Sequence, residues 1–191
     1  MTAVHSSHLV LGGARSGKSR HAVGLAARRG GRVAFLATAR ALDGDMAARI
    51  ARHRAERPAG WTTLEEAQDV VAAGRRAAAA HDLLVVDCVT VWVANLMERG
   101  DDDAAVLAAA AGLADLIRAR LLSTVIVSNE VGEGVHPPTE LGRRFRDLLG
   151  VVNQRLASAA DHVTLMVAGL PLTVKDGPAP PARPERAHEA P

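Results

Sequence analysis

Apolar positions follow two different periods along this chain. Short runs rich in β-branched residues alternate with longer segments of helical period, which is typical of an α/β protein with a mainly parallel sheet. We expect strands at His8 to Leu11, Arg32 to Ala37, Leu83 to Asp87, Thr124 to Ser128 and His162 to Val167, and a weaker one at Leu172 to Val174. The predicted helices are Gly17 to Arg29, Asp43 to Glu56, Leu64 to Ala80, Val89 to Met97, Asp102 to Leu121 and Thr139 to Ala160.

The last predicted helix has the most regular pattern. Its apolar residues fall within about a third of the helical circumference, as expected of a helix packed on a sheet. Two prolines, Pro137 and Pro138, precede it, which suits a helix start. The residues expected to pack on the sheet are Leu141, Phe145, Leu148, Leu149, Val152 and Leu156.

Composition limits the class of protein. With 191 residues, 48% hydrophobic and 23% charged, the chain falls in the range of ordinary globular domains, and we expect a single domain over residues 1–175. From Asp176 onward, prolines punctuate a segment with little to bury, which predicts a disordered tail over residues 176–191. The single cysteine, Cys88, excludes an intrachain disulfide and favours a reducing compartment.

Charge and aromatic content argue against two kinds of partner. The net charge of +2 is too small to indicate a polyanion-binding surface, and aromatic side chains, on which single-stranded nucleic acid stacks, make up only 2% of the chain. No uncharged apolar run reaches the ~18 residues of a membrane span, and the first residues lack a secretory signal pattern. We therefore expect a soluble cytoplasmic protein that does not bind nucleic acid.

A phosphate-binding motif follows the first predicted strand. The segment matches G-x-x-x-x-G-K-[ST] between a strand and a helix, the context that this motif requires. Its glycines let backbone N–H groups point at phosphate oxygens, Lys18 is expected to reach the β and γ phosphates, and the hydroxyl of Ser19 is expected to bind Mg²⁺. The predicted nucleotide-binding residues are Gly12, Gly13, Ala14, Arg15, Ser16, Gly17, Lys18 and Ser19.

An acidic partner for Mg²⁺ is expected at the end of a neighbouring strand. Asp87 ends the apolar run Leu83 to Asp87 and is the candidate. It also precedes a predicted helix, so a plain role as helix N-cap stays open. Cys88 beside it is interpreted as a small buried filler, because its apolar neighbours give no reason for a lowered thiol pKa.

A histidine lies among arginines in the segment Asp43 to Arg57. On a helix, His53 shares a face with Met46 and Ile50, with Arg49 and Arg57 one turn to either side. Basic neighbours favour a neutral imidazole, which is nucleophilic, and also supply partners for a phosphate. From periodicity alone, the simpler interpretation is a histidine that packs on an arginine-rich surface helix.

Five segments together resemble one enzyme family. They are GGARSGKSRHA at Gly12 to Ala22, LATARALDGDMAARIARHR at Leu36 to Arg54, DCVTVWVANL at Asp87 to Leu96, SNEVGEGVHP at Ser128 to Pro137 and FRDLLGVVNQRLA at Phe145 to Ala157. In this order they are similar to the bifunctional adenosylcobinamide kinase/adenosylcobinamide-phosphate guanylyltransferases of cobalamin biosynthesis. The resemblance implies a P-loop NTPase fold that is RecA-like, with a mainly parallel sheet and helices on both faces.

The resemblance also implies two reactions. A nucleoside triphosphate, ATP or GTP, phosphorylates adenosylcobinamide; GTP then transfers GMP to a histidine, releasing pyrophosphate, and adenosylcobinamide phosphate displaces the histidine to give adenosylcobinamide-GDP. By motif position that histidine is His53, with Lys18 as the second catalytic residue. The remaining GTP-binding residues implied are Ala37, Thr38, Ala39, Arg54, Ala55, Glu56, Arg57, Glu65 and Asp87.

Several points stay open at this stage. Where some relatives have a second histidine and a glutamate, this chain has Arg52 and Asp87, so whether Asp87 contacts Mg²⁺ or the nucleotide is undecided. Asn129 and Glu130 follow a strand and either contact the corrinoid substrate or cap a turn. The alternatives to the two-step enzyme are a plain P-loop kinase without a covalent intermediate and a GTP-dependent regulatory module. The resemblance suggests a homotrimer.

Overall fold

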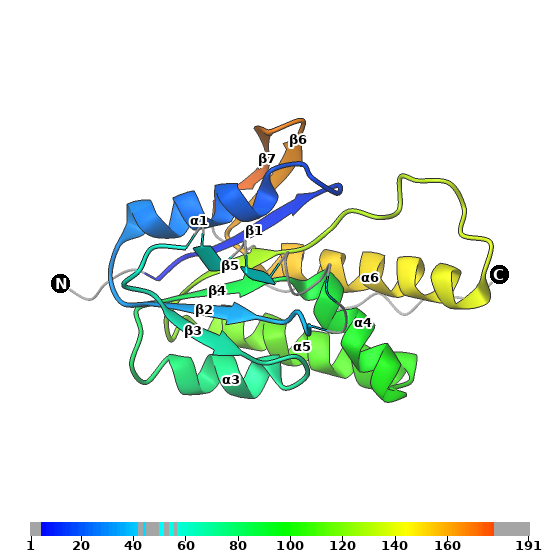
Figure 1. Ribbon diagram of the computed structural model, residues 1–191, viewed down its shortest axis with the longest axis horizontal. Coiled ribbons are helices and arrows are strands. Elements are labelled where there is room, and N and C mark those ends of the chain that lie inside the picture. The colour runs from blue at the N-terminus through cyan, green and yellow to red at the C-terminus, as the bar shows by residue number, and fades with distance from the viewer. Residues whose placement is uncertain (1–4, 42–43, 45–49, 52–53, 56, 178–191) are drawn as a thin grey trace.

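The computed structural model describes the chain at residues 5–41, 44, 50–51, 54–55 and 57–177. Across these residues the strands form one seven-stranded sheet in the order β3-β2-β4-β5-β1-β6-β7 (Figure 1). Neighbouring strands run parallel except β6 and β7, which form an antiparallel hairpin at one edge. The strands are β1 Ser7–Gly12, β2 Val33–Ala37, β3 Thr62–Glu65, β4 Leu83–Asp87, β5 Ser123–Val127, β6 His162–Val167 and β7 Leu170–Asp176.

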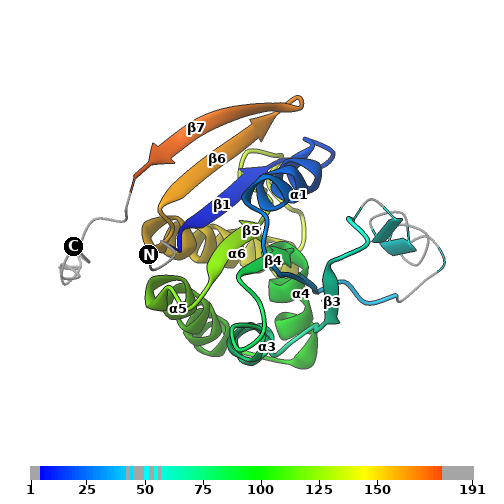
Figure 2. The ribbon, with the colours of Figure 1, turned by 90° about the vertical axis from the view of Figure 1, so that its left-hand side faces the viewer.

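Helices cover both faces of the sheet (Figure 2). On one face α1 (Lys18–Arg29) buries Ala22 and Ala26 against a cluster that includes Phe35 of β2. The other face carries α3 (Val70–Ala77), α4 (Val89–Arg99), α5 (Asp103–Ala119) and α6 (Glu140–Ala159). This arrangement confirms the predicted α/β fold with a mainly parallel sheet.

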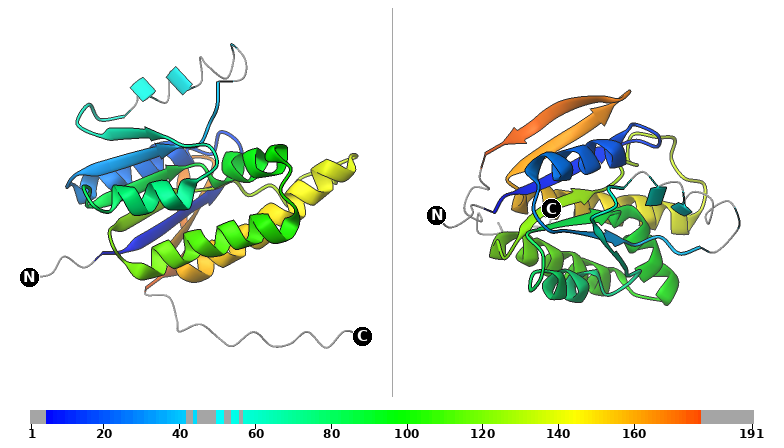
Figure 3. Two further views of the ribbon diagram at one scale, coloured as in Figure 1. Left: turned by 90° about the horizontal axis from the view of Figure 1, so that it is seen from below. Right: turned by 60° about the vertical axis from the view of Figure 1, so that its left-hand side comes forward.

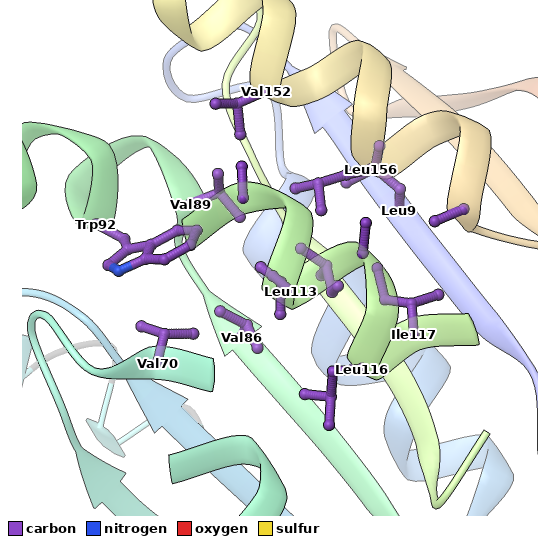
Figure 4. Packing of buried hydrophobic residues seen from close by; sticks show 14 of the residues in the cluster. Leu9, Val70, Val86, Val89, Trp92, Leu113, Leu116, Ile117, Val152 and Leu156 are labelled. Atoms are coloured by element: carbon purple, nitrogen blue, oxygen red, sulfur yellow. The ribbon is translucent and has the colours of Figure 1, made fainter. Parts of the chain in front are cut away.

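The larger core lies between the sheet and α3 to α6 (Figure 4). Trp92 of α4, Leu113 of α5 and Leu156 of α6 are at most 1% exposed and pack in the same cluster as Leu9 and Val86 of the sheet. Burying a large apolar side chain contributes about 1.5–3 kcal/mol, so this layer supplies much of the stability. It forms a rigid base for the loops that leave the strands.

The carboxyl ends of four strands meet at one edge of the sheet. In the register, Ala37 of β2 lies beside Asp87 of β4, Asp87 beside Val127 of β5, and Val127 beside Val10 of β1. Ligands of open parallel sheets bind outside this edge. The sequence motifs at the ends of β1, β2, β4 and β5 are therefore brought together.

The predicted helix from Leu64 to Ala80 is wrong in its first part. Thr62–Glu65 form the edge strand β3, parallel to β2. The carboxylate of Glu66 then accepts the backbone N–H groups of Gln68 and Asp69, each at 2.9 Å, and this turn separates the strand from α3. A strand of four residues is too short for its alternation to stand out beside a helical pattern.

One further boundary and one predicted packing residue differ from expectation. β7 runs to Asp176, so the strand predicted at Leu172 to Val174 is longer and includes the first residue of the predicted tail; residues 178–191 lie outside the described part of the chain. The helix α6 begins after its N-cap Thr139, as predicted, but Leu141 is 63% exposed. The first turns of α6 extend beyond the sheet (Figure 3), so Leu141 has no sheet to pack on.

Most of the predicted helix Asp43 to Glu56 lies outside the described residues, although positions 44, 50, 51, 54 and 55 are helical. Within the described part of the chain, no helix combines the length and the apolar character that a membrane crossing requires.

Candidate functional site

The phosphate-binding loop has the geometry that its motif predicts. It leaves β1 at Gly12 and enters α1 at Lys18, with Gly17 in the left-handed conformation at φ 90°. A Cβ on Gly12 would lie 2.8 Å from the carbonyl oxygen of Met166, so only glycine fits under the loop. The ammonium of Lys18 donates to the carbonyl of Gly13 at 2.9 Å, which holds it along the loop. The loop therefore presents a cation and the free amide end of α1 to a phosphate chain.

The turn of the β6–β7 hairpin is hydrogen-bonded to this loop. The backbone N–H of Gly169, in the hairpin turn, donates to the carbonyl of Ser16 at 3.1 Å. An added Cβ on Gly17 would come within 3.6 Å of Gly169. No pattern in the sequence indicated this contact, because it joins segments far apart in the chain.

Asp87 faces the start of α1. Its Oδ1 lies 3.4 Å from the hydroxyl of Ser19, and the N-cap of α4 is Cys88, so the alternative of Asp87 as the N-cap is wrong. Two oxygen donors at this spacing suit Mg²⁺, which takes few protein ligands and completes its shell with phosphate and water. Among the described residues, no group of three or more His, Cys, Asp or Glu side chains forms a metal cage. Ser19 and Asp87 are thus the residues whose oxygens could hold Mg²⁺ beside a nucleotide.

Thr38 anchors the end of β4. Its hydroxyl donates to the carbonyl of Cys88 and accepts the N–H of Cys88, both at 2.8 Å, and its own N–H donates to the carbonyl of Asp87. The side chain is fully buried. Thr38, predicted to bind GTP, is therefore buried, and its hydroxyl and N–H make hydrogen bonds to the backbone of Cys88 and Asp87. Burial raises the pKa of the Cys88 thiol to about 11, in agreement with a filler role.

Arg57 packs against β2 and β3. Its guanidinium lies 3.7 Å above the ring of Phe35 and donates to the hydroxyl of Thr63. Burial lowers the pKa of Arg57, while the charges of Asp87 and Glu65 act in the opposite direction. Arg57 remains a cation because its ordinary pKa is far above neutrality. It supplies positive charge near Asp87 and Glu65, whose charges act on it.

A cleft of about 790 Å³ opens beside β2 and β3. We call it the β2–β3 cleft. Arg54 and Glu65 form an exposed ion pair across it at 2.8 Å. Its volume is in the range of small-molecule sites. The lining residues are Ala39, Arg40, Ala41, Ile50, Ala51, Arg54, Ala55, Glu65, Glu66 and Ala67, which include four residues predicted to bind GTP.

Asn129 and Glu130 lie at the end of β5 beside the phosphate-binding loop. The N–H of Asn129 donates to the hydroxyl of Thr90 at 2.7 Å, and its carbonyl accepts from Asn153 at 2.9 Å. The N–H of Glu130 donates to the carbonyl of Gly12, and its carboxylate accepts from Gly132. The turn interpretation therefore accounts for the backbone of both residues.

Two predicted site residues, His53 and Glu56, lie outside the described residues. The structure brings together the loop residues, Asp87 and Arg57, and it places Ala39, Arg54, Ala55 and Glu65 in the neighbouring cleft. Sequence reasoning missed Asn95 and Trp92 of α4, which hold the backbone of the cleft loops. A buried amide in an otherwise apolar helix was the available signal.

The comparisons with known proteins agree with this geometry. The model of the family described as cobinamide kinase / cobinamide phosphate guanyltransferase (CobU) matches residues 8–174. The chain belongs to this family. The resemblance inferred from the five sequence segments is thereby confirmed.

Relatives in this family match nearly end to end. The bifunctional adenosylcobalamin biosynthesis protein CobP of Pseudomonas aeruginosa is 46% identical over 170 residues, covering 89% of this chain and 98% of that protein. The corresponding CobU of Salmonella typhimurium is 40% identical over 185 residues, covering 87% and 98%.

A solved structure of an ATPase from the type III secretion system of pathogenic bacteria shares the fold, with a TM-score of 0.53 and 13% identity over 88% of this chain. This chain covers 56% of that protein, and the likeness shows the P-loop, RecA-like fold alone.

Proposed function

We propose that this protein phosphorylates adenosylcobinamide with ATP or GTP and then transfers GMP from GTP to the product, giving adenosylcobinamide-GDP and pyrophosphate. The family match over residues 8–174 carries this proposal. The relatives CobP and CobU, which are named as bifunctional proteins of adenosylcobalamin biosynthesis, support it. The fold supplies a phosphate-binding loop and a separate cleft, which suits an enzyme with two reactions.

In the kinase reaction, the hydroxyl of adenosylcobinamide attacks the γ-phosphorus of the nucleotide and the bond to the β-phosphate oxygen breaks. The N–H groups of the loop and the ammonium of Lys18 stabilise the charge that develops on the phosphates. Ser19 and Asp87 are the residues that would hold Mg²⁺, which neutralises phosphate charge when it is bound.

In the transferase reaction, a neutral imidazole nitrogen of His53 attacks the α-phosphorus of GTP. A nitrogen–phosphorus bond forms and the bond to pyrophosphate breaks; a phosphate oxygen of adenosylcobinamide phosphate then attacks the same phosphorus and releases the histidine. Arg54 and Ala55, next to His53 in the chain, line the β2–β3 cleft. We assign the guanosine portion of GTP to this cleft, with Arg57 beside the phosphates.

We further infer a homotrimer and a cytoplasmic location. The sequence resemblance supports the first, and the single cysteine supports the second. Light scattering during size-exclusion chromatography should give a mass near three times 19.9 kDa, and a mass of one chain at working concentration would contradict the trimer.

Two separate assays test the proposed function. In the first, adenosylcobinamide and ATP are supplied and adenosylcobinamide phosphate is measured; in the second, adenosylcobinamide phosphate and GTP are supplied and pyrophosphate is measured. Lys18→Ala should lose most of the first activity. His53→Ala should keep the first activity and lose the second. A wild-type protein active only in the first assay is a plain kinase, and one inactive in both contradicts the proposal.

A further inference from the structure

Asn95 of α4 joins two loops that surround the β2–β3 cleft. Its side-chain amide donates to the carbonyl of Thr38 at 2.9 Å and to the carbonyl of Ala67 at 3.0 Å. The residue is 5% exposed, and its neighbours on α4, Val93 and Leu96, are apolar core residues. An asparagine in such a position needs partners, and both of its amide hydrogens have one.

The two carbonyls belong to the loop after β2 and the loop after β3, both of which contribute residues to the lining of the cleft. Thr38 is followed directly by Ala39, Arg40 and Ala41, which line the wall after β2, and Ala67 is itself part of the wall after β3. The N–H of Glu66 donates to the carbonyl of Ala37 at 3.0 Å where the two loops begin, and one residue further along each loop the NH₂ group of Asn95 holds both backbones. The spacing of the two loops beyond this point therefore depends on a buried side chain that is not among the lining residues.

The first of these contacts continues to the end of β4. The hydroxyl of Thr38 is hydrogen-bonded to the N–H and the carbonyl of Cys88, next to Asp87. Asn95 thus connects, through Thr38, the cleft and the carboxylate that faces Ser19.

Other residues of α4 hold the same loops at separate points. The indole N–H of Trp92 donates to the carbonyl of Gln68 at 2.8 Å, and Glu98 pairs with Arg40 at 3.0 Å. These contacts anchor one loop each. Among the described side-chain hydrogen bonds of α4, those of the Asn95 amide reach both the loop after β2 and the loop after β3.

We propose that Asn95 is a positioning residue for nucleotide binding in the β2–β3 cleft, acting by fixing the spacing of the loops after β2 and β3. The proposal rests on the assignment of guanosine nucleotide to this cleft. Removing the amide leaves two backbone carbonyls without their buried donor, and the loops move apart to reach water. Because residues of both loops line the proposed nucleotide site, the affinity for nucleotide falls although Asn95 is not itself a lining residue.

The test uses Asn95→Ala and Asn95→Asp, with Ser7→Ala as the matched control. Asp has nearly the same shape as Asn, but its carboxylate accepts hydrogen bonds where the amide donates them. Asn95→Asp therefore shows whether the protein needs the hydrogen-bond donor at this position or only a side chain of this size. Ser7 is also 5% exposed, and its hydroxyl also makes two hydrogen bonds, to Asp161 at the opposite end of the sheet. Each protein is assayed for thermal midpoint, for binding of a fluorescent GTP analogue, and for the KM for GTP in the transferase reaction.

Both Asn95 variants should raise the Kd and the KM for the guanosine nucleotide roughly ten- to a hundredfold, with a smaller change in kcat. Ser7→Ala should lower the thermal midpoint and leave both constants near wild type. Asn95 variants that lose only stability, as Ser7→Ala does, would overturn the proposal, and so would Asn95→Asp with wild-type constants. A buried carboxylate facing two carbonyls can prevent folding of Asn95→Asp, in which case Asn95→Ala decides; if Asn95→Ala is the variant that does not fold, Asn95→Asp decides.

The binding assay separates this inference from the proposed function. A wild-type protein that binds the analogue but forms no product contradicts the proposed reaction, while weakened binding by the Asn95 variants still supports the positioning role. Full catalytic activity with unchanged binding in the variants contradicts the positioning role alone.

Discussion

Replacing Thr38 with valine tests how the end of β4 is held. Valine keeps the branched shape of threonine and removes the hydroxyl that bridges to Cys88. The N–H of Cys88 then loses its acceptor, which costs about 1–3 kcal/mol in a buried setting. The carbonyl of Cys88 still accepts from the N–H of Trp92 at 3.1 Å, so its loss is smaller, about 0.5–1.5 kcal/mol. We expect Thr38→Val to lower the free energy of unfolding by about 2–4 kcal/mol.

Thr38→Ser is the control, because it keeps the hydroxyl and loses one buried methyl group, worth about 1 kcal/mol. For a chain of this length, 1 kcal/mol shifts the thermal midpoint by about 2–4 °C, so Thr38→Val should melt at least ~2 °C below Thr38→Ser. Hydrogen exchange at the Cys88 amide should also be faster in Thr38→Val. Equal midpoints and equal exchange in the two variants would refute the role given to the hydroxyl.

Three other outcomes follow from the structure. Gly12→Ala should lose about 1–3 kcal/mol of stability and most kinase activity, since its Cβ would meet the carbonyl of Met166; a variant as stable and active as wild type, by thermal unfolding and initial rate, counts against the loop geometry. Asp87→Asn should require roughly tenfold more Mg²⁺ for half-maximal kinase rate, and an unchanged Mg²⁺ titration would remove Asp87 from the metal site. Burial, followed by the charges of His162 and His21, lowers the pKa of His8 from 6.5 to about 4, whereas Asp176 raises it. Because the unfolded chain takes up a proton that folded His8 resists, stability should fall by about 1–2 kcal/mol between pH 6.5 and 4, after allowance for solvent screening. His8→Gln should flatten this part of the profile, and a slope equal to that of wild type would assign it to other groups.

Local patterns predicted most of the framework. The strands around Val10, Phe35, Val85 and Val125 appear as apolar runs, and the glycines and Lys18 of the phosphate-binding loop occur at fixed spacings, so both are visible in a single sequence. β3 was missed because an edge strand of four residues owes its form to pairing with β2. Leu141 was placed wrongly because periodicity shows which face of a helix is apolar and does not show where the sheet ends.

The site was predicted less completely. Asp87 was identified because a carboxylate after an apolar strand has a local signature, and its contact with Ser19 agrees with that assignment. The roles of Thr38 and Asn95 in holding the loops depend on hydrogen bonds between residues 28 to 57 positions apart, and strand order decides which loops meet. Such contacts become visible only when the chain is folded.

The central claim is that this protein carries GMP on a histidine during catalysis. The most direct measurement incubates the protein with GTP labelled at the α-phosphate, isolates the denatured chain and maps the label. The account predicts a label that is stable in alkali, labile in acid, located on the peptide containing His53, discharged by adenosylcobinamide phosphate and absent from His53→Ala. A label that persists in His53→Ala, or a protein that makes adenosylcobinamide-GDP without ever carrying the label, would contradict it.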